Sequence, residues 1–197
     1  AGFTTVREAG SSQYSAFSLR RGTAEGVIPG PRIIAAGPAL AIVGGHGDTT
    51  GFTEPVNELL ASGYSCTGAV ECAENVRRAS RAGSDITIDH GTFADEAALK
   101  VMKANGTVMV PTLMAFKGVE EGLGKGIYTP VVETKIRETL GSVGKAVAAA
   151  KKMGVPVAFG TDAGVFPHGR NAEEFQLMVN AGLTNREAVA SATTIAA

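Results

Sequence analysis

Four residues of this chain combine a chemically useful side chain with a glycine-rich turn: Asp162, His46, His90 and His168. Asp162 follows an apolar run after Pro156 that is too short for a helix and is closed by glycine, a pattern typical of a strand buried on both faces. A carboxylate at the carboxyl end of such a strand can bind a metal ion or move a proton. The alternative, that Asp162 only caps the following turn, stays open.

The positions of the histidines indicate a metal site. Each of the three stands next to a glycine, in a turn after or between predicted strands, and none lies in a predicted helix. A divalent metal ion is bound by imidazoles and carboxylates, and the ends of parallel strands gather such ligands from distant parts of a sequence. For each histidine alone, a hydrogen-bonded turn residue is the alternative. Together with Asp162, the histidines favour metal binding.

Strands alternate with helices along the chain. The predicted strands lie at 2–7, 33–36, 86–90, 107–111 and near 157. The predicted helices lie at 15–22, 69–82, 94–104 and 130–153, with two more that begin at the capping boxes Asn171–Glu174 and Thr184–Glu187. The segments 44–65 and 117–128 are predicted to be loops. This alternation predicts an α/β fold with parallel strands, and five strands mean either an open sheet or a barrel with pieces missing.

Composition narrows the class of protein. The 197 residues are 44% hydrophobic with a formal net charge of −1, which suits one soluble globular core. The charge gives no reason to expect nucleic acid as a partner, and no apolar stretch reaches the roughly 18 residues that span a membrane. Cys66 and Cys72 have a spacing that fits neither a zinc knuckle nor a redox pair. We therefore expect free thiols in a reducing, cytoplasmic compartment, and a homo-oligomer is left open.

Familiar catalytic motifs do not occur: the sequence contains no H-E-x-x-H, G-x-S-x-G, P-loop or G-x-G-x-x-G pattern. Five other segments, in order along the chain, resemble the amidohydrolase superfamily. The branch that they resemble is related to imidazolonepropionase and includes Xaa-Pro dipeptidases and a zinc-dependent arginine carboxypeptidase. The segments are Gly2-Phe3-Thr4-Thr5-Val6-Arg7, Ile28-Pro29-Gly30-Pro31-Arg32, Gly44-Gly45-His46-Gly47-Asp48, Asp89-His90-Gly91-Thr92 and Phe159-Gly160-Thr161-Asp162.

The resemblance implies a (β/α)8 TIM-like barrel, with residues 1–197 forming one partial barrel domain and one or two divalent ions, first of all zinc, at its mouth. It implies that His90 ends the sixth strand as a metal ligand. It further implies that Asp162 ends the eighth strand, contacts the metal and serves as the general base. A metal ion lowers the pKa of bound water from about 16 toward 7 and polarises the carbonyl to be cleaved.

The resemblance also implies features that the sequence does not show. The His-x-His pair of the first strand would precede Ala1, and the small β-sandwich domain is not present. The lysine of strand four and the histidine of strand five should lie between Cys72 and His90. We therefore expect the chain to be incomplete, with a segment missing near residues 85–89.

Two classes of function remain. The first is metal-dependent hydrolysis of an amide bond in a dipeptide or other small substrate, by a dipeptidase or carboxypeptidase of the Xaa-Pro or a related type. The alternative within this class is an imidazolonepropionase-like cyclic amidohydrolase. By position, His46, His168 and Arg170 are candidates for binding the substrate's free carboxylate. Their alternative roles are two turn histidines and a solvated arginine. The second class is a truncated barrel that catalyses nothing and acts as a structural or interaction module.

Overall fold

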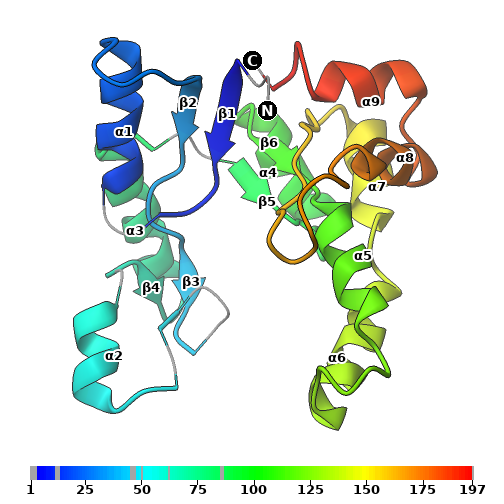
Figure 1. Ribbon diagram of the computed structural model, residues 1–197, viewed down its shortest axis with the longest axis horizontal. Helices are drawn as coiled ribbons and strands as arrows, with labels where there is room; N and C mark the ends of the chain where they lie inside the picture. Colours follow the sequence, from blue (N-terminus) through cyan, green and yellow to red (C-terminus); the bar gives the residue numbers. More distant parts are fainter. Residues whose placement is uncertain are drawn as a thin grey trace. The chain divides into compact units, whose positions relative to one another are not determined.

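The structure is a computed structural model that describes residues 4–11, 14–44, 48–49, 51–61, 63–84 and 87–196 (Figure 1). The chain divides into two compact units, Ala1–Ile86 and Thr87–Ala197. The division falls within the stretch 85–89, where the sequence predicts a missing segment. Asp85 and Ile86 themselves lie outside the described residues.

The first unit contains two short pairs of parallel strands. Strand β1 (Thr5–Glu8) pairs with β2 (Arg32–Ala35), and helix α1 (Ser15–Ala24) connects them. Ala16 of α1 packs with Ile33 and Ala35 of β2 in a small buried cluster. Strand β3 (Ala41–Ile42) pairs with β4 (Ser65–Cys66), with helix α2 (Glu54–Leu60) between them in sequence and helix α3 (Ala69–Arg81) after them.

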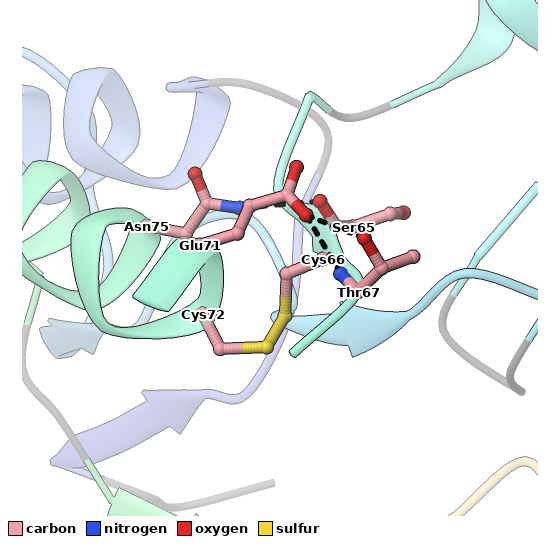
Figure 2. Close-up of a disulfide and its surroundings, with 6 residues drawn as sticks. All are labelled: Ser65, Cys66, Thr67, Glu71, Cys72 and Asn75. Carbon is pink, nitrogen blue, oxygen red and sulfur yellow. Dashed lines mark hydrogen bonds between the residues drawn. A yellow bond between two sulfur atoms is a disulfide. The ribbon is translucent and has the colours of Figure 1, made fainter. Parts of the chain in front are cut away.

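Cys66 and Cys72 form a disulfide, so the prediction of free thiols is wrong (Figure 2). Cys66 is the last residue of β4 and Cys72 lies in the first turn of α3, and the tight turn between these elements brings their Cα atoms to 5.1 Å. Glu71 closes the same turn by accepting hydrogen bonds from the N–H (2.7 Å) and the hydroxyl (2.9 Å) of Thr67. Because disulfides persist mainly in oxidising environments, the prediction of a reducing compartment loses its basis.

The second unit alternates strands with helices and continues as a helical segment. Its strands are β5 (Thr87–Asp89) and β6 (Val108–Val110), with helix α4 (Glu96–Ala104) between them. After β6 come α5 (Leu113–Glu121), α6 (Pro130–Leu140), α7 (Lys145–Met153), α8 (Glu173–Asn180) and α9 (Asn185–Ser191).

Strand β6 is paired on both edges. On one edge it pairs in parallel with β5, residue Ile88 opposite Met109. On the other edge the Met109 N–H donates to the Pro156 carbonyl and Met109 accepts from the Ala158 N–H, both at 2.9 Å, which forms a parallel bridge to Val157. The Met109 side chain is fully buried in the core of the unit, as expected for a parallel strand covered on both faces.

Several predicted elements differ from the observed ones. The predicted loop 117–128 is wrong in its first part, because α5 extends to Glu121. The predicted helix 130–153 is two helices, since Gly144 adopts a left-handed φ of 82° and ends the continuity between α6 and α7. The capping box Thr184–Glu187 is confirmed, whereas the predicted box Asn171–Glu174 is wrong because Ala172 occupies the N-cap of α8.

The described residues do not form a closed barrel. Their strands make three two-stranded parallel sheets, with the bridge at Val157 as an addition to one of them. This arrangement matches part of the predicted α/β fold, with parallel pairs and intervening helices. No helix within the described ranges has both the length and the apolar character needed to cross a membrane.

Candidate active site at the carboxyl ends of three parallel strands

Three residues with unusual backbone conformations follow the three neighbouring strand segments of the second unit. His90 follows β5 with φ 65°, Thr112 follows β6 with φ 47°, and Asp162 follows the Val157 bridge with φ 52°. They are the non-glycine residues with positive φ among those that the structure describes. Left-handed backbone costs energy for residues with a Cβ, most of all for a β-branched threonine, and such strain gathers at functional sites.

The loop that carries Asp162 lies against the end of β6. A Cβ built on Gly160 would meet the Cγ1 of Val110 at 2.3 Å and the Cγ2 of Thr112 at 3.9 Å. Only glycine therefore fits this close approach, and the chain after Val157 passes directly beside the residues that follow β6. The three strained residues consequently belong to the same edge of the parallel strands.

The imidazole of His90 is oriented by Thr112. The Nδ1 of His90 and the Oγ1 of Thr112 form a short hydrogen bond, and the Thr112 hydroxyl donates its proton to the Pro111 carbonyl at 2.8 Å. A hydroxyl has one proton, so Thr112 accepts from His90 and the proton of the neutral imidazole resides on Nδ1. The Nε2 lone pair is thereby left for a metal ion or a substrate proton. The ring edge also contacts Phe116 at a centroid distance of 5.8 Å.

The side chain of Asp162 is exposed, and the turn after it is closed by the backbone. The Val165 N–H donates to the main-chain carbonyl of Asp162 at 3.4 Å, so this turn closure does not use the carboxylate. The residue before it, Thr161, is buried and its hydroxyl accepts a hydrogen bond from the Asn171 side chain at 2.9 Å. This bond ties the Asp162 loop to the start of α8.

Arg170 forms ion pairs with two carboxylates. Its guanidinium donates two hydrogen bonds to Glu121, at 2.8 and 2.9 Å, and two to Glu173, at 2.7 and 2.8 Å. Glu173 and then Glu121 raise the pKa of the guanidinium above its ordinary value. A substrate carboxylate would have to compete with these partners, so substrate binding by Arg170 stays a prediction.

The structure describes His168 but not His46. His168 is exposed in the turn before α8, with Gly169 beside it, and the Gly169 N–H donates to the Asn171 side-chain oxygen at 3.3 Å. His46 lies outside the described residues, in the first unit. The roles of both histidines in substrate binding stay predictions.

Glu174 is a buried acid that sequence reasoning missed as a functional residue. Its side chain is 0% exposed, and its two oxygens accept the N–H groups of Leu113 (3.0 Å) and Met114 (2.7 Å), the first residues of α5. Burial raises the pKa of Glu174 to about 7, although the two hydrogen bonds act in the opposite direction. In the sequence, Glu174 stands three residues after Asn171, and this spacing suggests a capping box at the start of the helix that contains Glu174. The spacing therefore gave no indication that Glu174 caps the different helix α5.

Two further observations delimit the site. Within the described ranges, no three side chains of His, Cys, Asp or Glu lie close enough together to hold a metal ion. A cavity of about 490 Å³ is lined by residues of α5, α6, α7 and α8, among them Phe116, Leu140 and Leu177. None of the predicted site residues that the structure describes lines this cavity. The candidate site is therefore the exposed edge formed by the strand ends.

Comparisons with known sequences give a partial match. No protein-family profile matches the chain. An uncharacterized protein of Mycobacterium tuberculosis and one of Mycobacterium bovis are each 34% identical over 141 residues, which are 70% of this chain and 37% of the relative. The chain thus spans little more than a third of the length of the curated relatives that it matches.

Comparisons with solved structures identify the fold. A Xaa-Pro dipeptidase with methionine bound in its active site is 30% identical, with a TM-score of 0.71 over 99% of this chain and 64% of that chain. The chain has the fold of part of an amidohydrolase. The second similar structure is a prolidase complexed with N-methylphosphonate-L-proline (24% identity, TM-score 0.68), and the match covers 99% of this chain and 63% of the prolidase. The third is the A. niger ochratoxinase (21% identity, TM-score 0.73), and the match covers 99% of this chain and 60% of the ochratoxinase.

Proposed function

We propose that this chain is part of a metal-dependent hydrolase that cleaves an amide bond, with Xaa-Pro dipeptides as the first substrate class. The observation that carries the proposal is the edge where His90, Thr112 and Asp162 adopt strained backbone conformations at the ends of three parallel strand segments. The amidohydrolase fold and the similarity to a Xaa-Pro dipeptidase and a prolidase support the choice of reaction and substrate.

His90 and Asp162 fit a divalent metal ion by the chemistry of their donor atoms. The Nε2 of His90 has a free lone pair because Nδ1 is engaged by Thr112, and the Asp162 carboxylate is exposed at the same edge. Two protein ligands are fewer than a catalytic zinc site uses, so further ligands would come from outside the described residues. When bound, a divalent ion supplies a nucleophilic water at neutral pH and polarises the scissile carbonyl.

Asp162 is the proton carrier of the proposed reaction. Its carboxylate accepts a proton from the attacking water as the new C–O bond forms at the carbonyl carbon. It then returns this proton to the leaving amine nitrogen as the C–N bond breaks, so the residue ends in its starting state. Thr112 holds His90 in one tautomer through both steps.

Substrate recognition in this proposal uses cationic and hydrogen-bonding groups for the free carboxylate of the dipeptide. Arg170 and His168 lie in the segment before α8, and Asn171 links that segment to Thr161, next to Asp162. His46 is the third candidate. We also propose that the barrel of the intact protein includes segments beyond this chain, because the chain covers 60–64% of the similar solved structures cited above.

The test is hydrolysis of Xaa-Pro dipeptides and N-acyl amino acids by the intact protein that contains this chain, loaded with zinc. Asp162→Asn should lower kcat by about 10²–10⁴-fold while zinc content stays unchanged, because general base catalysis supplies that range. His90→Ala should lower the zinc content. Asp95→Asn is the matched control, since Asp95 caps α4 and should leave kcat unchanged.

The outcomes separate the competing functions. Near-full activity of Asp162→Asn would remove this residue as the base, and unchanged zinc content in His90→Ala would remove the ligand role. Hydrolysis confined to cyclic amides would favour the imidazolonepropionase-like alternative. If neither zinc binding nor any hydrolysis is detected, the proposed function fails and the structural module remains.

A further inference from the structure

Helix α5 is capped by a residue that is remote in sequence. Its N-cap residue is Thr112, a type that usually caps by accepting an N–H of the first turn with its own hydroxyl. In this chain the Thr112 side chain makes no such bond. The carboxylate of Glu174, 61 positions after Leu113 and 60 after Met114, accepts the N–H groups of these two residues instead.

The remote cap leaves the Thr112 hydroxyl free for His90. The Thr112 hydroxyl accepts from the His90 Nδ1, donates to the Pro111 carbonyl and makes no bond to a helical N–H. To cap the helix, the side chain would have to turn about χ1, which would move its oxygen away from His90. Without another acceptor, the N–H groups of Leu113 and Met114 would be buried and unpaired, which is costly. Glu174 removes this competition for the hydroxyl.

We propose that Glu174 is a positioning residue that acts through Thr112 to hold the His90 imidazole in its Nδ1-protonated form, with Nε2 facing outward. The consequence for hydrolysis rests on the proposed function, whereas the orientation of His90 does not. The carboxylate of Glu174 accepts from Leu113 and Met114, neither of which is proposed to bind the metal ion, so its effect on the site is indirect.

The segment around Glu174 is built to keep this geometry rigid. Arg170 pairs with Glu121 at the last residue of α5, so residues 170–174 hold both ends of that helix. Asn171 in the same segment binds Thr161, beside Asp162. One short stretch before and within α8 therefore binds the residue before Asp162 and both ends of the helix that follows Thr112, the partner of His90.

The experiment measures the tautomer of His90 directly. The chain has three histidines, so the ring nitrogen signals of a protein labelled with ¹⁵N-histidine can be assigned by substituting each in turn. Where the ring nitrogen signals show a neutral imidazole, we expect wild-type His90 to be in the Nδ1-protonated form. In Glu174→Gln, whose amide has one acceptor for two N–H groups, the Thr112 hydroxyl should turn to cap α5 and His90 should lose this preference.

A second readout follows zinc binding. Loss of an outer partner that orients a metal-binding histidine typically weakens metal affinity by about 10–100-fold, and we expect this loss for Glu174→Gln. Thr112→Val should change the His90 signals in the same way, and adding Glu174→Gln to it should produce no further change. Additive effects of the two substitutions would show that Glu174 does not act through Thr112.

Controls distinguish positioning from stability. Glu187→Gln removes a helix-capping carboxylate from α9 and should leave the His90 signals unchanged. If Glu174→Gln does not fold, Glu174→Asp, which keeps the charge but has a shorter reach, should give a smaller change in the same direction. The inference would be overturned if a folded Glu174 variant, or Thr112→Val, left the His90 signals unchanged. It would also be overturned if the control Glu187→Gln changed these signals in the same way as Glu174→Gln. None of these outcomes depends on hydrolysis, so the proposed function can fail separately.

Discussion

Two glutamates of the second unit cap helices in opposite surroundings. Glu187 is partly exposed, with 44% of its side chain accessible, and it exchanges hydrogen bonds with Thr184 three residues before it. Glu174 is fully buried and caps α5 from another helix. A hydrogen bond to Lys151 and two to Thr184 lower the pKa of Glu187 to about 2, whereas burial raises that of Glu174 to about 7.

The comparison teaches that the same capping task leaves very different traces in a sequence. The Thr184–Glu187 box is local, and its spacing alone predicts it correctly. The cap of α5 depends on a contact between residues 60 or more positions apart, so no sequence pattern near Leu113 predicts it. The remote cap is also the one next to the candidate site, where it leaves Thr112 available to His90.

The largest expected difference between the two caps is in stability. Glu174→Ala should lower the free energy of unfolding by about 2–5 kcal/mol, because two buried N–H groups lose their acceptor and a cavity replaces the side chain. Glu187→Ala should cost less, since water can reach the exposed groups. Denaturant unfolding of both variants tests this, and equal losses would contradict the contrast between buried and exposed caps.

The two carboxylates should respond to pH in opposite directions. The pKa of Glu174 in the folded protein lies above its ordinary value of 4.5. Its contribution to the free energy of unfolding is therefore complete below about pH 4.5 and is lost as the pH rises through about 7. The pKa of Glu187 is lowered in the folded protein, so its contribution to the free energy of unfolding is present above about pH 4.5 and is lost as the pH falls toward about 2.

Unfolding measured across pH checks these signs with charge-removing variants. Glu174→Gln should flatten the fall in stability between about pH 4.5 and 7, and Glu187→Gln should flatten the change between about pH 4.5 and 2. An unaltered slope between pH 4.5 and 7 in Glu174→Gln would show that this residue is not the titrating group.

The smallest expected effect belongs to the threonine of the local cap. Thr184→Ala should lower the free energy of unfolding by about 1 kcal/mol, the usual loss for an N-cap hydroxyl. The Glu187 N–H loses its acceptor, but this end of α9 is exposed and water replaces the bond. Thermal unfolding measures the change, and a loss as large as that of Glu174→Ala would erase the difference between the two kinds of cap.

Sequence patterns predicted the elements whose signals are local. Strands β1, β2, β5 and β6 and helices α1, α3 and α4 follow from short apolar runs, helical spacing and glycine stops. Helix α5 was missed because it contains Gly118 and its cap comes from elsewhere. The break at Gly144 was missed because the glycine sits where a Cβ would lie 3.3 Å from the Cβ of Ala181, a contact that only packing reveals.

The disulfide was missed for a related reason. The spacing of Cys66 and Cys72 matches no familiar redox or zinc motif, so the sequence suggested separate thiols. The pairing depends on β4 ending directly before α3, and neither the short strand nor the turn between the two elements was predicted. Once this turn exists, the fourth residue of the helix comes back within reach of the strand end.

For the candidate site, the sequence singled out candidate residues but not the side chains that hydrogen-bond to them or pair with them. His90 and Asp162 were chosen because glycine turns after strands expose side chains, and the structure places both in strained conformations at one edge. The partners of these residues could not be predicted: Thr112 for His90, Asn171 beside Asp162 and Glu121 for Arg170. Each partner is distant in sequence or belongs to another element.

By itself, the sequence determined four of the strands, where many of the helices begin and end, and which side chains are candidates for chemistry, because these depend on neighbouring residues. Only the tertiary structure decided that a buried carboxylate at position 174 caps a distant helix and leaves a threonine hydroxyl to orient His90. The physical reason is burial: a hydrogen-bonding group removed from water must find a partner in space, and the nearest partner in space need not be near in sequence.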